Sequence, residues 1–175
     1  MPVLTIVDMQ NRFIDHLDGL SLNDLLNNVC ALVRIFRAKN LPIIALQYVT
    51  EHGFDLYDPV ERAQYQEFAW THPRILEELK GYDKFHVKWK NQDSGAIQVK
   101  NVLKKNKYDD KIIMCGVNAC ACVMDTWFNL KEKYKKEVYV VTEATRNCLD
   151  DDPVTDYISD VVPIKDVNNL LTSIK

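Results

Sequence analysis

The sequence predicts an α/β protein, a three-layer α/β/α sandwich around a mostly parallel sheet of six strands. Short apolar runs rich in β-branched residues recur along the chain, and segments with the helical spacing of apolar residues separate them. Strands that alternate with helices form βαβ units, which build a parallel sheet with helices on both faces. No linker, internal repeat or low-complexity segment interrupts the 175 residues. We therefore expect a single domain over residues 1–175.

Six segments are predicted as strands because they are short, apolar and bounded by charged or turn-forming residues. The first is apolar enough to be buried on both faces of the sheet. The predicted strands are Val3–Val7, Ile43–Tyr48, Phe85–Trp89, Lys111–Met114, Glu137–Val141 and Val161–Ile164.

Helices are predicted where apolar residues recur at three- and four-residue spacing, or where proline opens a polar segment. Residues 49–72 show no clear period, and we expect a long loop there, with one short helix at most. Long loops in small domains often bind ligands or cover sites. The predicted helices are Leu20–Ala38, Pro73–Leu79, Ser94–Asn106, Ala119–Tyr134 and Val167–Ile174, with a further short helix at about residues 153–158.

Composition limits the classes of function. The hydrophobic fraction of 47% and the charged fraction of 27% are typical of a globular protein in water. A formal net charge of -3 argues against a nucleic-acid partner, which requires a concentrated basic face. No apolar run approaches the ~20 residues of a membrane-spanning helix, so no membrane partner is expected. Five cysteines without a visible signal pattern predict reduced thiols in a cytoplasmic protein.

Reactive side chains follow three of the predicted strands. Asp8 follows the first strand, Lys88 lies at the end of the third, and Cys120 and Cys122 follow the fourth. Because the carboxyl ends of parallel strands meet at one edge of the sheet, we expect these side chains to share a site. A thiolate can attack an electrophilic carbon, a carboxylate can carry the proton, and an ammonium can hold both groups in place.

The two thiols lie just after a predicted turn from strand to helix at Gly116. The first N–H groups of a helix lack partners within the helix, and the helix dipole is positive there. Both effects favour a thiolate over a thiol. Backbone N–H groups after Val117 are also suited to stabilising an oxyanion. On a helix, Cys120 and Cys122 point in different directions, which disfavours a redox pair.

Three segments resemble the isochorismatase-like cysteine hydrolases. Residues 6–13, I-V-D-M-Q-N-R-F, are similar to the V-D-M-Q-x-x-F opening of that family. Residues 116–126, G-V-N-A-C-A-C-V-M-D-T, resemble its G-V-x-T-x-x-C-V-x-x-T segment, and residues 138–145, V-Y-V-V-T-E-A-T, resemble its late strand ending in D-A-T. The order of strands and helices agrees from end to end, so the resemblance covers nearly the whole chain.

The resemblance implies an Asp-Lys-Cys triad, which motif position assigns to Asp8, Lys88 and Cys122. It also implies a cis peptide bond between Val117 and Asn118 that helps to shape an oxyanion hole, with backbone donors near Asn118 and at Cys122. Phe13 is expected in the pocket wall, where the family often carries an aromatic residue.

The lysine segment departs from the family pattern. The family continues from its lysine towards S-A-F, whereas residues 88–96 read K-W-K-N-Q-D-S-G-A and lack the phenylalanine. Lys88 has the usual separation from the cysteine, but Lys90 is closer to the S-G-A, and the two have the same strand parity. We favour Lys88 as the triad lysine, and Lys90 stays open as the alternative. Lys90 and Trp89 are also candidate pocket residues.

Two further departures concern the other motifs. Ala119 replaces the threonine at the fourth position of the cysteine motif, which removes a hydroxyl from the turn. Glu143 replaces the aspartate of the D-A-T motif.

Nicotinamidases of this family bind a metal through a D-W-H-P-like segment after the second strand. Residues 47–53 read Q-Y-V-T-E-H-G instead. Glu51, His52 and His72 are the available ligands, but they lack the spacing of that segment. We therefore expect no metal and no other cofactor.

The resemblance and the predicted site imply a hydrolase that cleaves a C–N bond of a small amide, ureide or imide through an acyl-enzyme on Cys122. Two alternatives stay open at this stage. One is vinyl-ether hydrolysis with Asp8 as the acid, and the other is a binding or regulatory module of the same fold with weakened catalysis. By resemblance alone, we expect a small-molecule substrate and a homo-oligomer, either a dimer or a tetramer.

Overall fold

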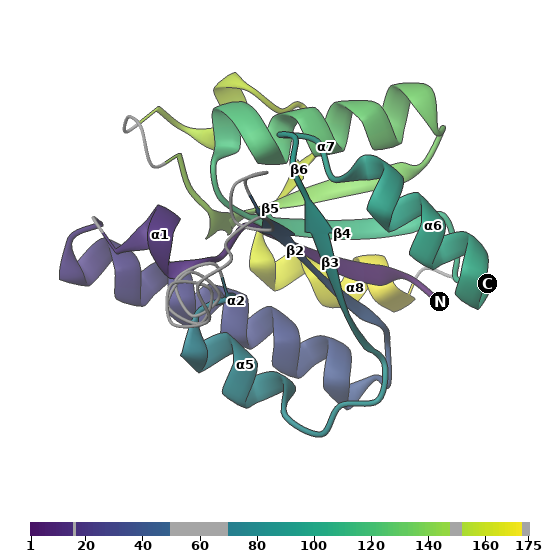
Figure 1. Ribbon diagram of the computed structural model, residues 1–175, viewed down its shortest axis with the longest axis horizontal. Coiled ribbons are helices and arrows are strands. Elements are labelled where there is room, and N and C mark those ends of the chain that lie inside the picture. The colour runs from purple at the N-terminus through teal and green to yellow at the C-terminus, as the bar shows by residue number, and fades with distance from the viewer. Residues whose placement is uncertain (16, 50–69, 148–151, 173–175) are drawn as a thin grey trace, which may run out of the picture.

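The computed structural model describes residues 1–15, 17–49, 70–147 and 152–172. A six-stranded sheet in the order β3-β2-β1-β4-β5-β6 forms its centre, and every neighbouring pair of strands is parallel (Figure 1). The predicted α/β class and the six-stranded sheet are therefore confirmed. The strands are β1 (Val3–Val7), β2 (Ile43–Tyr48), β3 (Phe85–Lys90), β4 (Lys111–Gly116), β5 (Glu137–Thr145) and β6 (Val161–Val162).

Helices cover both faces of the sheet. One face carries α2 (Gly19–Ala38), α5 (Pro73–Leu79) and α8 (Val167–Thr172), which share one apolar core cluster with the sheet. The opposite face carries α6 (Ala96–Asn106) and a helix in three parts (Figure 1). Its parts are the π-helical turn η1 (Ala119–Val123), α7 (Met124–Phe128) and the π-helical turn η2 (Asn129–Lys133). The short elements are α1 (Asn11–Ile14) and the 3-10 turns η3 (Val154–Asp156) and η4 (Ile164–Asp166).

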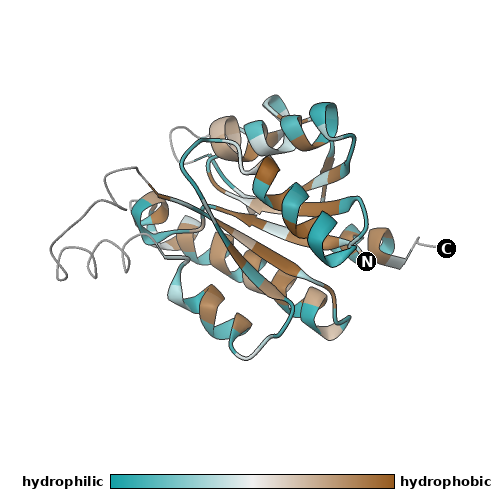
Figure 2. Cartoon of the chain, turned by 45° about the vertical axis from the view of Figure 1, so that its right-hand side comes forward, coloured by the Kyte–Doolittle hydropathy of each residue, from teal (hydrophilic) through white to brown (hydrophobic). Residues whose placement is uncertain are grey.

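Strand β1 lies at the centre of the sheet, between β2 and β4. Successive side chains of a strand point to opposite faces. Leu4 and Ile6 accordingly join the core under α2 and α5, whereas Val3 and Val7 join the core under α6 and α7. The apolar colouring of the central strands in Figure 2 follows from this burial on both faces. The β1–β4 pair is therefore buried, and the residues that follow the two strands start from a buried edge of the sheet.

Several element boundaries differ from the prediction. β5 continues past Val141 to Thr145, because a register shift after Met114 lets Thr145 pair with Gly116. β3 continues to Lys90, and β6 is limited to Val161–Val162. Most of the predicted loop at residues 49–72 lies outside the described residues.

Glu143, the departure from the D-A-T motif, serves a structural purpose. Its Oε2 accepts hydrogen bonds from the backbone N–H of Ile164 (3.0 Å) and from the Thr142 hydroxyl (2.8 Å). The Asn28 side chain donates to the Glu143 carbonyl oxygen (2.8 Å). The side-chain bond to Ile164 connects the end of β5 to the start of η4, over a distance that suits the longer glutamate side chain. The backbone bond from Asn28 connects the end of β5 to α2.

Among the described helices, none has both the length and the apolar character needed to cross a membrane. The four described cysteines, Cys30, Cys115, Cys120 and Cys122, form no disulfide with one another.

Candidate active site

Asp8 lies at the first residue after β1, where the chain turns sharply. Its φ of 49° is in the left-handed region, which is uncommon for residues other than glycine and is often found at functional sites. The backbone N–H of Asp8 donates to the Leu46 carbonyl oxygen (3.1 Å), which holds the turn against the end of β2. The side chain is only 1% exposed, so a carboxyl group is held inside the protein at the carboxyl edge of the sheet.

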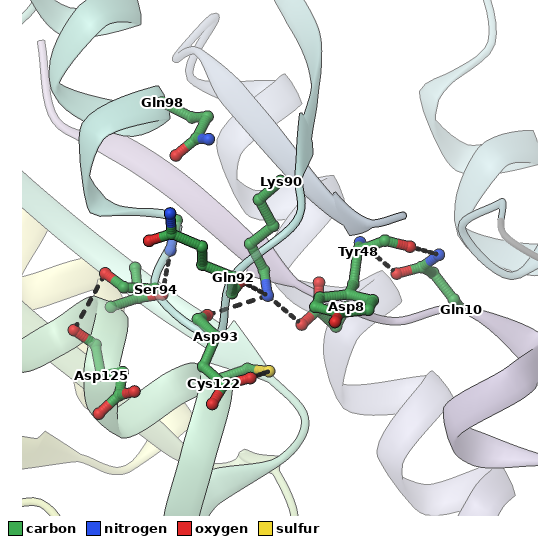
Figure 3. Close-up of polar contacts among 12 residues, drawn as sticks. Asp8, Gln10, Tyr48, Lys90, Gln92, Asp93, Ser94, Gln98, Cys122 and Asp125 are labelled. Atoms are coloured by element: carbon green, nitrogen blue, oxygen red, sulfur yellow. Dashed lines mark hydrogen bonds and ion pairs between the residues drawn. The ribbon is translucent and has the colours of Figure 1, made fainter. Parts of the chain in front are cut away.

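Lys90, at the last residue of β3, is the cation that accompanies this carboxyl group. Its Nζ lies 2.7 Å from Asp8 Oδ2, and its side chain is fully buried. Nζ also donates to the carbonyl oxygens of Gln92 (3.0 Å) and Asp93 (2.9 Å), as Figure 3 shows. An ammonium has three N–H donors, and all three therefore have partners. The Tyr48 ring, with its centroid 5.0 Å from Nζ, adds a cation–π contact.

The prediction that Lys88 is the lysine beside Asp8 is wrong. Lys88 pairs with Leu46, which itself pairs with Val7, so this register places Lys88 within the sheet. Lys90 pairs with Tyr48 at the end of the sheet and reaches Asp8. The exposed Lys88 side chain instead lines a groove of about 280 Å³ against α6.

Cys122 lies on η1, next to the contact between Asp8 and Lys90. It is 6% exposed, and its thiol interacts electrostatically with both members of the ion pair. The Cys122 thiol donates a hydrogen bond to Asp93 Oδ1, with 3.9 Å between Sγ and Oδ1. Carboxyl group, ammonium and thiol, which come from three different strand ends, therefore form one compact cluster (Figure 3).

Burial sets the protonation state of this cluster. It raises the pKa of the Cys122 thiol to about 12, and the Asp8 charge adds to the rise while the Lys90 charge opposes it. Burial likewise raises the pKa of Asp8, with Lys90 again opposing. Desolvation thus opposes the effect expected of the helix terminus, which favours a thiolate. At neutral pH Cys122 is a thiol that needs a base.

The turn between β4 and η1 brings the cysteine to this edge. Gly116 has a φ of 128°, and a Cβ there would lie 2.0 Å from the Val7 carbonyl oxygen, so only glycine fits. The next peptide bond, between Val117 and Asn118, is cis, at the position that the family resemblance implies. The Ala119 N–H donates to the Arg146 carbonyl oxygen (3.0 Å) and is thereby occupied. The N–H of Cys122 itself is the other oxyanion donor that the family resemblance implies.

A model of the isochorismatase domain matches residues 2–159. The chain belongs to the isochorismatase family. Members of this family are hydrolases, and some of them are amidases. A search of curated protein sequences finds no match.

Solved structures of the family share the fold at low sequence identity. N-carbamoylsarcosine amidase from Thermoplasma acidophilum is similar with a TM-score of 0.71 and 21% identity, covering 93% of this chain and 96% of that one. An isochorismatase family protein from Desulfovibrio vulgaris gives 0.71 and 18%, covering 97% of each chain. A nicotinamidase from Staphylococcus aureus gives 0.66 and 14%, covering 83% of each.

The aromatic residues considered for the pocket occupy different positions. Phe13 packs edge-to-face on Tyr48, with ring centroids 6.1 Å apart, and so lies beside the Tyr48–Lys90 contact. Trp89 alternates with Lys90 on β3, so its side chain, 39% exposed, points to the opposite face of the sheet. Phe13 therefore lies close to the candidate site, whereas Trp89 faces away from Lys90.

Sequence reasoning missed two charged residues at this edge. Asp93 reaches the thiol from the stretched segment after the lysine, and that departure from the family pattern was the signal available for it. The Arg12 guanidinium lies over the rings of Phe13 (4.7 Å) and Tyr48 (5.5 Å), and its charge lowers the pKa of Asp8. The sequence feature that could have identified Arg12 is its position between Asp8 and Phe13 in the opening motif.

The residues considered as metal ligands are not brought together in the part of the chain that the structure describes. Glu51 and His52 lie outside the described residues. His72 begins α5, where its Nδ1 accepts a hydrogen bond from the Arg74 N–H (3.2 Å). Within the described ranges, no group of three or more His, Cys, Asp and Glu side chains has the arrangement of a metal site.

Proposed function

We propose that this protein is a cysteine hydrolase that cleaves a C–N bond of a small amide, ureide or imide through an acyl-enzyme on Cys122. The observation that carries the proposal is the buried ion pair of 2.7 Å between Asp8 and Lys90 beside the Cys122 thiol. An ionisable cluster with strongly perturbed pKa values in a buried site is typical of catalysis. The amidases among the structural neighbours support this choice of reaction class.

The first step is attack by sulfur. Asp8 takes the proton of the Cys122 thiol, and the sulfur forms a bond to the substrate carbonyl carbon. The carbonyl electrons move to oxygen, where we expect the Cys122 N–H to stabilise the negative charge. The raised pKa of Asp8 suits this transfer, because a carboxylate in an apolar site is a stronger base than one in water. The Lys90 charge opposes the rise in the pKa of the Cys122 thiol and so helps it to ionise.

The second step releases the amine. The tetrahedral intermediate collapses, the C–N bond breaks, and protonated Asp8 gives its proton to the leaving nitrogen. Water then attacks the thioester carbon, Asp8 accepts a proton from that water, and the acid is released as the thiol re-forms. Asp8 thus alternates between base and acid, and every proton is accounted for.

Lys90 keeps the cluster in its reactive arrangement. Its three donors are held by Asp8 and by two backbone carbonyl oxygens, so the ammonium cannot swing away during the reaction. Its charge favours the Asp8 carboxylate, and it stabilises the Cys122 thiolate while that thiolate exists.

One observation favours a second candidate reaction. The raised pKa of Asp8 also suits a carboxylic acid that protonates a vinyl ether, a reaction in which a nucleophile is dispensable. The two reactions differ in their need for the thiol.

A panel of small amides, ureides and hydroxamates, read by ammonia or amine release, tests the proposal. We expect Cys122→Ala to abolish turnover, and Cys120→Ala, which removes a thiol two residues away, to retain it. A transient thioester on the peptide containing Cys122 should be detected by mass spectrometry of the acid-quenched enzyme.

Other outcomes decide against covalent catalysis. Turnover that survives Cys122→Ala but not Asp8→Ala would establish acid catalysis of the vinyl-ether type. Binding of panel compounds with no turnover and no thioester would assign the chain as a binding module of the family.

A further inference from the structure

We infer that Asp93 is a specificity-determining residue, whose carboxylate accepts a hydrogen bond from an N–H group attached to the substrate carbon under attack. The substrate is therefore a carbamoyl or ureido compound with an unsubstituted NH₂ on that carbon. The inference rests on the proposed function, because it assigns a substrate class to the same Cys122 site. The Asp93 side chain approaches within 3.9 Å of Cys122 Sγ.

The backbone on both sides of Asp93 is held in place. Lys90 Nζ binds the carbonyl oxygens of Gln92 (3.0 Å) and Asp93 (2.9 Å). Further along, the Ser94 hydroxyl donates to the Asp125 carbonyl oxygen (3.3 Å), and the Gly95 N–H donates to the buried hydroxyl of Thr126 (2.9 Å). The segment is thus fastened to the lysine of the site at one end and to α7 at the other, so the position of Asp93 follows from the site itself.

Two carboxyl groups flank the thiol in different environments. Asp8 is buried and paired with Lys90, which suits a group that exchanges protons. Asp93 is exposed, and its Oδ1 faces the sulfur (Figure 3). Since Asp8 and the two backbone carbonyl oxygens occupy the three donors of Lys90, that ammonium has no N–H left for the Asp93 carboxylate.

The distances permit one hydrogen bond to the reacting carbon. A near-attack substrate places its carbon ~3–3.5 Å from sulfur. An amide nitrogen lies ~1.3 Å from that carbon, and its N–H reaches an oxygen at ~2.7–3.2 Å. Sulfur, carbon, nitrogen and the Asp93 oxygen can therefore form a closed quadrilateral with these lengths, whose fourth side is the 3.9 Å between Sγ and Asp93 Oδ1. An NH₂ group on the reacting carbon can therefore donate to Asp93 while the carbon faces the sulfur.

The charge of Asp93 also determines what is rejected. A carboxylate accepts N–H groups and repels an anionic substituent at the same position. An ester, whose reacting carbon carries no N–H group, gains no such hydrogen bond to Asp93. The site should therefore prefer a carbamoyl end over an isosteric ester.

Charged thiol reagents test the position of Asp93 without a known substrate. We compare labelling rates of Cys122 by cationic and anionic methanethiosulfonates, read on the Cys122 peptide by mass spectrometry. We expect Asp93→Asn to lower the ratio of cationic to anionic rates by roughly fivefold, because a unit charge about 4 Å away is removed. Asp83→Asn, an exposed carboxylate beside the opposite end of β3, is the matched control and should leave the ratio unchanged. Equal ratios in the two variants would overturn the placement.

A substrate comparison tests the recognition. For a primary carbamoyl substrate from the ammonia panel, we expect Asp93→Ala to lower kcat/KM by about tenfold or more, the usual effect of losing a charged hydrogen bond. For the matching activated ester, which lacks the N–H, kcat/KM should stay within about twofold, a difference too small to represent a lost hydrogen bond.

Equal losses on both substrates would overturn the role of Asp93 while leaving covalent catalysis intact. Ester turnover that survives Cys122→Ala would instead overturn the proposed function itself. The two failures are therefore distinguishable.

Discussion

At the scale of single residues, the site depends on how three ionisable groups influence one another. Asp8 raises the pKa of Cys122, whereas Lys90 lowers the pKa of both Asp8 and Cys122. Burial strengthens each of these effects because water does not screen them. Replacing Lys90 therefore changes the pKa of both Asp8 and Cys122, and replacing Asp8 changes the pKa of Cys122.

Asp8→Asn should separate thiol reactivity from turnover. The variant removes the Asp8 charge, which raises the pKa of Cys122, and it leaves the Lys90 charge that lowers it. We expect the pKa of Cys122 to fall and its alkylation by a neutral reagent at pH 8 to become faster, while hydrolysis is lost. Slower alkylation than in the wild type would contradict this electrostatic account.

The two lysines of β3 provide a matched pair of variants. Lys90→Met leaves a buried carboxyl group without its cation, which typically costs about 3–5 kcal/mol of unfolding free energy. Lys88→Met alters an exposed side chain and should change stability by less than about 0.5 kcal/mol. Urea unfolding and the hydrolysis assay of both variants check the assignment, and it fails if Lys88→Met is the more damaging of the two.

At the scale of elements, the site depends on the close approach of β1 and β4. Val117 N–H donates to the Val7 carbonyl oxygen (3.0 Å), and Gly116 pairs with Val7 directly. This contact brings the ends of the two strands together, so that Asp8 and the turn leading to Cys122 start from the same point of the sheet.

Gly116→Ala should disrupt this approach. The new Cβ would lie 2.0 Å from the Val7 carbonyl oxygen, and the φ of 128° is unfavourable for alanine. We expect a loss of about 3 kcal/mol or more in unfolding free energy, measured by chemical denaturation. Gly19→Ala, where no atom lies within 4 Å of the added Cβ, is the control. Its unfolding free energy should change by about 1 kcal/mol at most, so similar losses in both variants would contradict the steric argument.

At the scale of the whole molecule, the sheet is buried on both faces, and this burial encloses thiols. Cys115 on β4 is fully buried in the core under α2, and desolvation raises the pKa of its thiol. A thiol that stays protonated in the folded protein but ionises when unfolded makes stability depend on pH.

The sign of that dependence is a loss of stability in alkali. The folded pKa of Cys115 lies above the ordinary value of 9.0, so its contribution is complete below pH 9 and is lost as pH rises above it. The expected loss is about 1.4 kcal/mol per pH unit above that value. Urea unfolding of Cys115→Ala at pH 8, 9 and 10 should show a shallower decline than the wild type. Ile113→Val, a truncation in the same core, is the control and should decline as steeply as the wild type.

Much of the fold and part of the site follow from local sequence patterns. Alternation of apolar strands with amphipathic helices is enough to predict a parallel sheet, because the hydrophobic period reports burial directly. The positions of Asp8 and Cys122 follow from the same pattern, since residues just after parallel strands meet at one edge. Element ends were less predictable. β5 continues to Thr145 because of a register shift in its pairing with β4, and local pattern carries no record of such a shift.

Local patterns in the chain are enough to predict the fold class, the edge where the reactive groups gather and two members of the cluster. The choice between Lys88 and Lys90 required the folded sheet, because two residues of the same strand parity are equivalent until pairing with β2 sets their register. The folded structure also decided the protonation of Cys122, since the pKa depends on desolvation by residues distant in sequence. Asp93 belongs to the same group: its approach to the thiol depends on a segment fastened at one end by Lys90 and at the other by Thr126.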